Sequence, residues 1–361
     1  DTLNSKFGFK WKPVDDLLIR GNWAEGFRAP SISNLFGGAG ASYDTYGDPC
    51  SNDSPYYNNP GVAARCLAAG IPASYTQREG YNSQTAWPFD WVSNVELSPE
   101  TSTSQTLGFV YSPSYVTGLN ISLDWWKIEI ENVISRPTAG YMLEQCYAEG
   151  NSGWCDVVAN SGITRNALGQ ITFLQRALQN LGATEVEGFD LTVRYNLPET
   201  NFGSFSFLWD SVYMSSYRTK ATPDAEWDPS SVGLYSQSTP TWRIRSNLTA
   251  TWSLGDFGAS WTTRYFSGMY ESCAYVSVAE LCSDPTRRTE NGAAPRNRIS
   301  ATTYHDVQLR YNVPWNATVS LGVNNVFKKE PPVSTRSFAN SFDYQYDTPG
   351  RYMYMEYRQK F

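Results

Sequence analysis

The sequence has 361 residues, with 28 Lys and Arg against 35 Asp and Glu, one histidine and a net charge of −7. Charged residues make up 17% and aromatic residues 15%, a composition that excludes intrinsic disorder and argues against a coiled coil. The acidic balance gives no support to nucleic-acid binding, and no apolar run of about 18 residues predicts a transmembrane helix. An aromatic-rich chain of low charge is typical of an all-β transmembrane barrel.

Alternating apolar and polar residues predict eleven antiparallel strands. In the fourth, for example, Leu119, Ile121 and Leu123 share the face opposite to that of Asp124. The eleven segments are residues 3–12, 17–23, 107–111, 119–126, 189–195, 205–213, 242–252, 257–265, 307–313, 319–323 and 352–361. The pattern therefore continues to both ends of the chain. We expect a secretion signal to precede residue 1, since none begins the sequence.

The connections between these strands alternate strictly between short and long. Short turns begin near Pro13, Pro113, Leu197, Gly255 and Pro314, whereas long loops cover about 29–100, 136–182, 219–239, 268–299 and 328–349. This asymmetry is typical of a barrel with short periplasmic turns and long extracellular loops. Because an antiparallel barrel closes with an even number of strands, we interpret residues 1–361 as one partial domain of a larger barrel, half of a 22-stranded one.

The six cysteines fall two by two into three long loops. Local pairing would join Cys50 to Cys66, Cys146 to Cys155 and Cys273 to Cys282, although 15 connectivities are possible in principle. Metal binding is the alternative, but no CxxC pair or histidine cluster supports it. We therefore expect disulfides formed in an oxidising compartment.

Five motifs in order carry a family resemblance. They are Arg20-Gly-Asn-Trp-Ala-Glu-Gly-Phe-Arg-Ala-Pro-Ser-Ile-Ser-Asn-Leu-Phe36, Leu97-Ser-Pro-Glu-Thr-Ser-Thr-Ser104, Glu185-Val-Glu-Gly-Phe-Asp190, Gly322-Val-Asn-Asn-Val-Phe327 and Tyr346-Asp-Thr-Pro-Gly-Arg351. Together they resemble the barrel of TonB-dependent outer-membrane receptors. The strand that closes on Phe361 likewise resembles the terminal strand that such barrels present to the barrel assembly machinery. The resemblance implies the carboxy-terminal half of a 22-stranded barrel, without its plug domain.

The resemblance implies active import of a scarce nutrient across the outer membrane of a Gram-negative bacterium. The implied partners are the chain's own plug and amino-terminal half, TonB acting through the plug, membrane lipid and lipopolysaccharide, and a small nutrient. No cofactor, metal or catalytic residue is expected. His305 and Asp306 are neighbours on a strand, so their side chains point to opposite faces and cannot form a dyad. By the alternation of the strand, His305 falls on the outward face. A passive porin or a surface-binding barrel is the alternative class.

The ligand is harder to predict. Loop aromatics could stack on sugar rings, and the candidates are Trp87, Trp91, Trp154, Trp227, Tyr43 and Tyr81. The 29–100 loop carries a net charge of −5, which should not attract an anionic ferric chelate. We therefore favour an oligosaccharide, with a ferric siderophore as the alternative. Asp224, Glu226 and Asp228 stand at every second position and could offer carboxylate oxygens to Ca²⁺. A solvated acidic loop is the simpler interpretation.

Charged residues on the polar faces of the strands are candidates for contact with the plug or the ligand. They are Arg20, Asp124, Arg194, Arg243, Arg245, Arg264 and Arg310. Plug contact is the preferred assignment, because a filled lumen must pair its polar lining.

Overall fold

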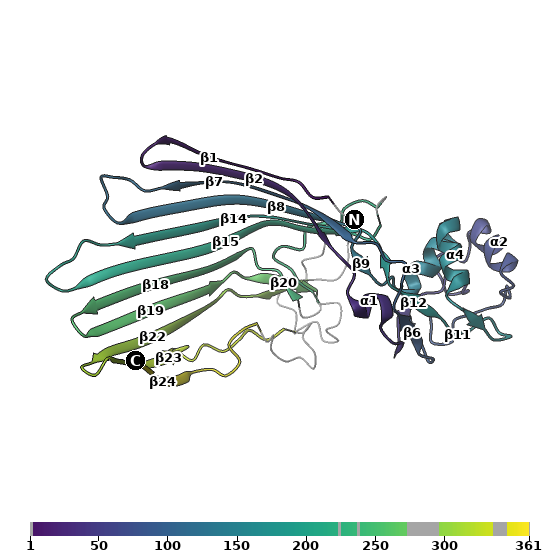
Figure 1. Ribbon diagram of the computed structural model, residues 1–361. Coiled ribbons are helices and arrows are strands. Elements are labelled where there is room, and N and C mark those ends of the chain that lie inside the picture. The colour runs from purple at the N-terminus through teal and green to yellow at the C-terminus, as the bar shows by residue number, and fades with distance from the viewer. Residues whose placement is uncertain (1–2, 223–224, 237–238, 273–295, 335–344, 361) are drawn as a thin grey trace.

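The computed structural model describes residues 3–222, 225–236, 239–272, 296–334 and 345–360. Its main feature is one antiparallel sheet of eleven strands, in which each strand pairs with the next in the sheet order (Figure 1). The strands are β1 (Lys6–Val14), β2 (Leu17–Arg28), β7 (Glu100–Tyr111), β8 (Leu119–Glu131), β14 (Ala183–Asn196), β15 (Ser204–Lys220), β18 (Ile244–Leu254), β19 (Phe257–Phe266), β22 (Thr302–Val313), β23 (Ala317–Asn324) and β24 (Tyr352–Gln359). The expectation of eleven strands is confirmed.

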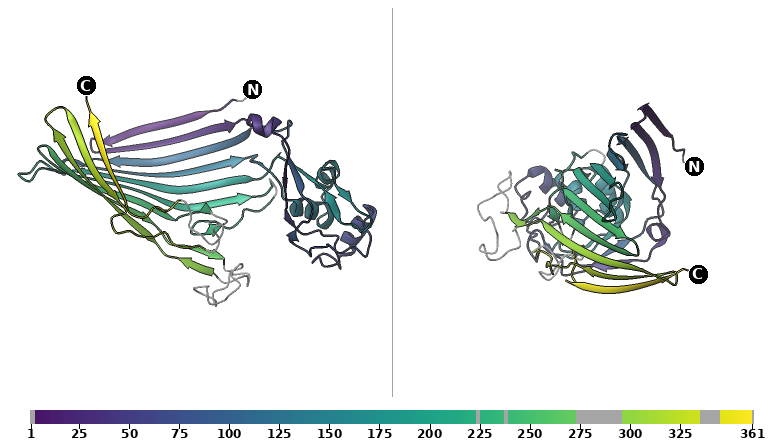
Figure 2. Two further views of the ribbon diagram at one scale, coloured as in Figure 1. Left: turned by 90° about the horizontal axis from the view of Figure 1, so that it is seen from below. Right: turned by 90° about the vertical axis from the view of Figure 1, so that its left-hand side faces the viewer.

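The sheet is curved, and β1 and β24 form its two edges (Figure 2). The short turns lie together at one end of the sheet and the long connections at the other (Figure 1). The sorting of connections expected from the sequence is therefore confirmed. We call these the short-turn end and the long-loop end.

The register gives the sheet two chemically different faces. Phe9, Gly21, Leu107, Trp125 and Phe189 form one continuous cross-strand row, and the adjacent row contains Lys10, Arg20, Gly108, Asp124 and Asp190. Apolar side chains on the face of the first row are exposed. Phe7 is 70% exposed, Leu107 51% and Met355 71%. An exposed apolar face of this extent suits contact with lipid rather than with a protein core.

On the polar face, a glycine makes room for an aromatic ring on the neighbouring strand. A Cβ atom on Gly322 of β23 would lie 2.1 Å from the ring of Tyr354 on β24, so only glycine leaves room for that ring. The Tyr354 hydroxyl accepts a hydrogen bond of 3.0 Å from the Gln308 amide on β22. The ring therefore ties the last strand to the two before it.

The first two long connections form a folded unit, not the irregular segments that the sequence suggested. We call residues 29–99 and 132–182 the loop domain; it lies beyond the long-loop end of the sheet (Figures 1 and 2). Its helices are α1 (Ile32–Phe36), α2 (Pro60–Ala68), α3 (Ala139–Leu143), the π-helix η1 (Glu144–Ala148) and α4 (Ser152–Asn160). Its strands are β3 (Gly40–Ser42), β4 (Thr45–Tyr46), β5 (Ser83–Gln84), β6 (Phe89–Val92), β9 (Ile134–Ser135), β10 (Thr164–Arg165), β11 (Ile171–Phe173), β12 (Gln175–Ala177) and β13 (Gln179–Asn180).

The two connections share one hydrophobic core. Phe89 from the first and Leu143 and Leu174 from the second are all fully buried in it. The strands mix as well, since β6 lies between β3 of its own connection and β12 of the other. Neither connection can therefore form this structure alone.

Two disulfides stabilise the loop domain and confirm two of the predicted pairs. Cys50 is bonded to Cys66 and Cys146 to Cys155. The third expected pair, Cys273 and Cys282, lies outside the described residues, as does Phe361.

The remaining long connections contribute β16 (Tyr235–Ser236), β17 (Thr239–Pro240), β20 (Met269–Ser272) and β21 (Arg296–Ile299). Within the described parts of the chain, no helix has the length and apolar character needed to cross a membrane.

Candidate functional site at the long-loop end

An aromatic cluster covers the polar face where β18, β19 and β22 reach the long-loop end. We call it the mouth cluster; its buried members are Tyr235, Trp242, Phe266, Met269, Ile299, Tyr304 and Tyr346. The Trp242 indole donates a 3.1 Å hydrogen bond to the Tyr346 hydroxyl, which ties the last long connection to the segment leading into β18. Three long connections thus fold onto the polar face instead of extending away from it.

Two arginines accompany the mouth cluster. The Arg245 guanidinium lies 5.2 Å from the ring centre of Trp242 and 5.4 Å from that of Phe266, within the range of cation–π attraction. Arg243 donates a long hydrogen bond of 3.4 Å to the carbonyl of Val232. In the described part of the chain neither forms an ion pair with a carboxylate. Their charges are therefore available to an anion near the mouth cluster.

The other predicted polar-face residues fall into two groups. Arg20 forms a bidentate pair with Asp124, at 2.6 and 2.9 Å, so these two satisfy each other within the wall. Arg264 binds Asp306 at 2.7 Å and also Asp347, and so anchors the last long connection. By contrast, Arg194 and Arg310 have no carboxylate partner among the residues that the structure describes. Contact with a plug remains our prediction for these two.

His305 lies on the apolar face, as expected from its parity. Its ring packs against Trp261 and Phe327, with ring centres 5.5 and 5.2 Å away, whereas Asp306 points to the polar face and binds Arg264. The two neighbours therefore do not form a dyad.

The loop tryptophans pack against neighbouring side chains to different degrees, and Trp91 remains 45% exposed. Trp154 is only 8% exposed and packs edge-on against Tyr141, so it belongs to the core and is not a ligand-contact surface. The ring of Trp91 lies 4.9 Å from the Arg136 guanidinium, and that of Trp87 lies 5.7 Å from Arg78.

Trp227 lies against two cations of β15, with Arg218 at 5.4 Å and Lys220 at 5.3 Å from its ring centre. Tyr81 packs on Gly47, where a Cβ atom would lie 2.5 Å from its ring. Of the six aromatic candidates, Tyr43, at 57% exposure, is the one whose ring has no packing contact described here. Asp224 of the possible Ca²⁺ set lies outside the described residues.

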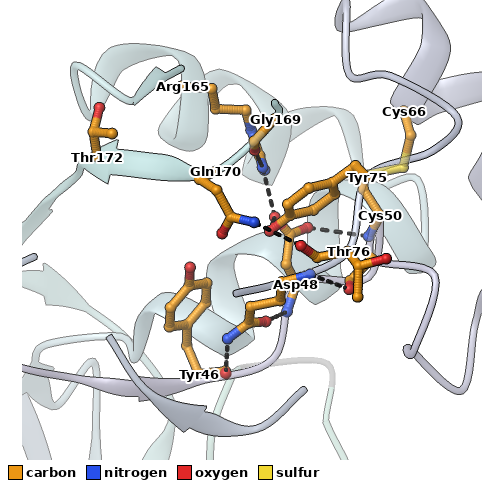
Figure 3. A network of polar contacts seen from close by, with 12 residues as sticks. Tyr46, Asp48, Cys50, Cys66, Tyr75, Thr76, Arg165, Gly169, Gln170 and Thr172 are labelled. Carbon is orange, nitrogen blue, oxygen red and sulfur yellow. Dashed lines mark hydrogen bonds and ion pairs between the residues drawn. A yellow bond between two sulfur atoms is a disulfide. The ribbon is translucent and has the colours of Figure 1, made fainter. Parts of the chain in front are cut away.

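A buried polar network joins the two halves of the loop domain around Asp48 (Figure 3). The Asp48 carboxylate accepts hydrogen bonds from the Arg165 guanidinium at 2.6 Å, from the Tyr75 hydroxyl at 3.1 Å and from the Cys50 amide at 3.0 Å. Burial, and then the charge of Asp48, raises the pKa of Tyr75. Burial alone would lower the pKa of Arg165, but Asp48 outweighs it and the pKa is raised. Arg165 therefore stays protonated and the Tyr75 phenol stays neutral.

This network also changes the charge expected for the loop. Asp48 is paired with Arg165, and Asp44 forms an ion pair of 2.6 Å with Arg176. Both arginines come from the second connection, so the carboxylates of the first are partly neutralised by its neighbour. The acidic surface expected from residues 29–100 alone is correspondingly reduced.

Residues 1–326 match the family model described as TonB dependent receptor-like, beta-barrel. The chain belongs to the TonB-dependent receptors. This is a family of outer-membrane receptors and transporters, not a class of enzymes. No curated protein sequence matches this receptor significantly.

Solved structures support the same fold. The receptor is similar to a mutant of the ferric enterobactin receptor PfeA from Pseudomonas aeruginosa, with 14% identity and a TM-score of 0.59 over 99% of this chain and 40% of that one. It is similar to the siderophore receptor PirA from Acinetobacter baumannii, with 16% identity and a TM-score of 0.59 over 99% and 41%. It is also similar to the iron transporter FrpB from Neisseria meningitidis, with 12% identity and a TM-score of 0.54 over 100% of this chain and 39% of that one. The chain thus spans about two-fifths of the length of these proteins.

Proposed function

We propose that this chain forms the carboxy-terminal part of a receptor that imports a ferric siderophore through the outer membrane, powered by TonB. The long-loop end faces the outside and the short-turn end the periplasm. Further strands complete the barrel between β1 and β24, and a plug fills the lumen. The observation that carries the choice of ligand is the mouth cluster with its two arginines, Arg243 and Arg245, on the polar face.

The charge of that surface suits an anionic chelate. A guanidinium attracts a negatively charged iron complex, and Arg243 and Arg245 are both exposed beside the buried rings of the mouth cluster. The solved relatives include a ferric enterobactin receptor and a siderophore receptor, which points the same way.

The oligosaccharide favoured by the sequence loses part of its support. Trp154 is buried, and Trp87, Trp91 and Trp227 each already have a cation against the ring. The acidic loop surface that argued against an anion is partly neutralised by Arg165 and Arg176.

The test is binding and uptake by the full-length receptor in iron-starved cells, with radiolabelled ferric enterobactin and maltohexaose as probes. We expect uptake of the chelate only, and a loss of affinity of roughly tenfold or more in Arg245→Ala, as for removal of one charge-assisted contact. Lys12→Ala, at the short-turn end, should leave uptake unchanged. Saccharide binding without chelate binding would refute the proposal.

A further inference from the structure

The loop domain joins the sheet through four chain segments that are tied to one another. They are the end of β2 at Arg28, the segment leading into β7 at 98–100, the segment leaving β8 at 132–134, and the segment leading into β14 at 178–182. Two side chains, Glu100 and Asn180, make most of the cross-connections. We call this region the junction.

Glu100 connects three of these segments. Its carboxylate accepts two hydrogen bonds from the Arg28 guanidinium, at 2.5 and 2.6 Å, and one of 2.7 Å from the Ile134 amide. Arg28 is 65% exposed, but the Glu100 side chain is only 7% exposed. A buried carboxylate with three donors of two kinds is held in one orientation, because each bond would be lost by rotation.

Asn180 makes the complementary connection. Its side-chain oxygen accepts from the Ser98 amide at 2.8 Å, and its side-chain nitrogen donates to the carbonyls of Ser98 and Asn132, each at 2.9 Å. A second amide side chain, that of Asn94, donates to the carbonyl of Leu178 at 2.9 Å. The incoming and outgoing segments of both connections are thus fixed relative to each other.

Above the junction the loop domain is a single body. The shared core, the Asp48–Arg165 pair and the two disulfides hold its two halves together. The orientation set at the junction is therefore the orientation of the whole loop domain beyond the long-loop end of the sheet (Figure 1).

We propose that Glu100 is a positioning residue for ligand capture. It touches no ligand; through Arg28 and Ile134 it holds the loop domain in one orientation beyond the long-loop end, the end at which the ligand of the proposed function enters. The role in capture rests on the proposed function. The role in orienting the loop domain does not.

The experiment uses the full-length receptor in outer-membrane vesicles, with nitroxide labels at cysteines introduced in place of Leu67 on α2 and Leu107 on β7. Both side chains are exposed, at 57% and 51%. Electron–electron resonance gives the distance distribution between the loop domain and the wall. Uptake of ferric enterobactin, measured with unlabelled receptor, gives the half-saturation concentration and the maximal rate.

Glu100→Ala should broaden the distance distribution and raise the half-saturation concentration about tenfold, with a maximal rate within about twofold of wild type, since only capture depends on orientation. Glu100→Gln keeps an acceptor for the Ile134 amide, so both its distance distribution and its half-saturation concentration should lie between those of wild type and Glu100→Ala. The charge swap Arg28→Glu with Glu100→Arg should restore part of both readouts. Glu96→Gln, an exposed neighbour whose side chain makes no hydrogen bond described here, is the matched control and should change neither.

An unchanged distance distribution in Glu100→Ala would overturn the proposal, whatever the ligand. A broadened distribution with unchanged half-saturation would overturn the role in capture. If wild-type receptor does not take up ferric enterobactin, the proposed ligand fails, and the distance measurement still decides whether Glu100 sets the orientation.

Discussion

Asp48 and Arg165 are separated by 117 residues in the sequence, yet their side chains meet at 2.6 Å in the interior of the loop domain. The Asp48 side chain is fully buried and that of Arg165 is 14% exposed. The two belong to different connections of the barrel, with β7 and β8 between them. The pair therefore reports whether the two connections have folded together.

Replacing Arg165 by Ala should destabilise the loop domain by about 3–5 kcal/mol, because it leaves the Asp48 carboxylate buried without its partner. Hydrogen exchange of the segments around residues 46–52 and 163–172 measures this directly. Arg78→Ala is the control, since Arg78 lies on the surface over Trp87. Combining Asp48→Asn with Arg165→Met should cost less than Arg165→Ala alone; an equal or larger cost would contradict the explanation.

Replacing a disulfide pair by serines should cost about 3 kcal/mol for Cys50–Cys66 and slightly less for Cys146–Cys155. The bridges close loops of 16 and 9 residues, and the unfolded chain gains more freedom from the longer one. Chemical denaturation of the receptor, followed by protease resistance of the loop domain, measures both. A larger effect from the shorter loop would show that native contacts, and not chain entropy, dominate.

Acidification should stabilise the loop domain through Asp44. Burial raises the pKa of this carboxyl group despite the opposing charges of Arg176 and Arg136 and a hydrogen bond from Ser42. Because the folded state then holds the proton more tightly than the unfolded chain, this contribution to stability falls as the pH rises from the unfolded value near 3.8 through the raised folded value. Asp44→Asn should flatten that part of the pH profile, measured by thermal unfolding. A steeper profile in the variant would mean that the pKa shift has the opposite sign.

Gly322→Ala should destabilise the end of the sheet by about 1–3 kcal/mol, because the new methyl group would overlap the Tyr354 ring. The Gln308–Tyr354 hydrogen bond should be lost with it. Gly258→Ala on β19 is a matched control, since its added methyl group would meet only the end of the flexible Arg310 side chain, at 3.0 Å. Thermal unfolding of both purified variants separates the two cases. Equal melting temperatures would refute a specific fit between Gly322 and Tyr354.

The wall of the barrel could be predicted from the sequence because its signal is local. Alternation along Leu119 to Trp125 states which residues face lipid, and turn residues such as Pro113 and Gly255 mark the strand ends. The parity argument also placed His305 correctly, because it needs no knowledge of distant residues. Two cysteine pairs could be predicted for the same reason, since each closes within one connection.

The loop domain could not be predicted in this way, because its core is made between two connections. No residue near Asp48 in the sequence indicates that its partner is Arg165. From the sequence alone, its carboxylate is therefore interpreted as a surface charge. Trp154 resembles a binding residue for the same reason, until Tyr141 is seen to cover it. Composition identifies polar and aromatic side chains, but only packing decides whether they face a ligand, a cation or the core.

The shared core has a consequence for receptor engineering and for divergence among related genes. Residues 29–99 cannot be transplanted into another barrel by themselves, since residues 132–182 supply nine of the fifteen buried residues of the shared core. A viable chimera has to carry both inserts, together with the hairpin of β7 and β8 between them, as one cassette. Recombination breakpoints that survive selection should accordingly fall outside residues 28–183.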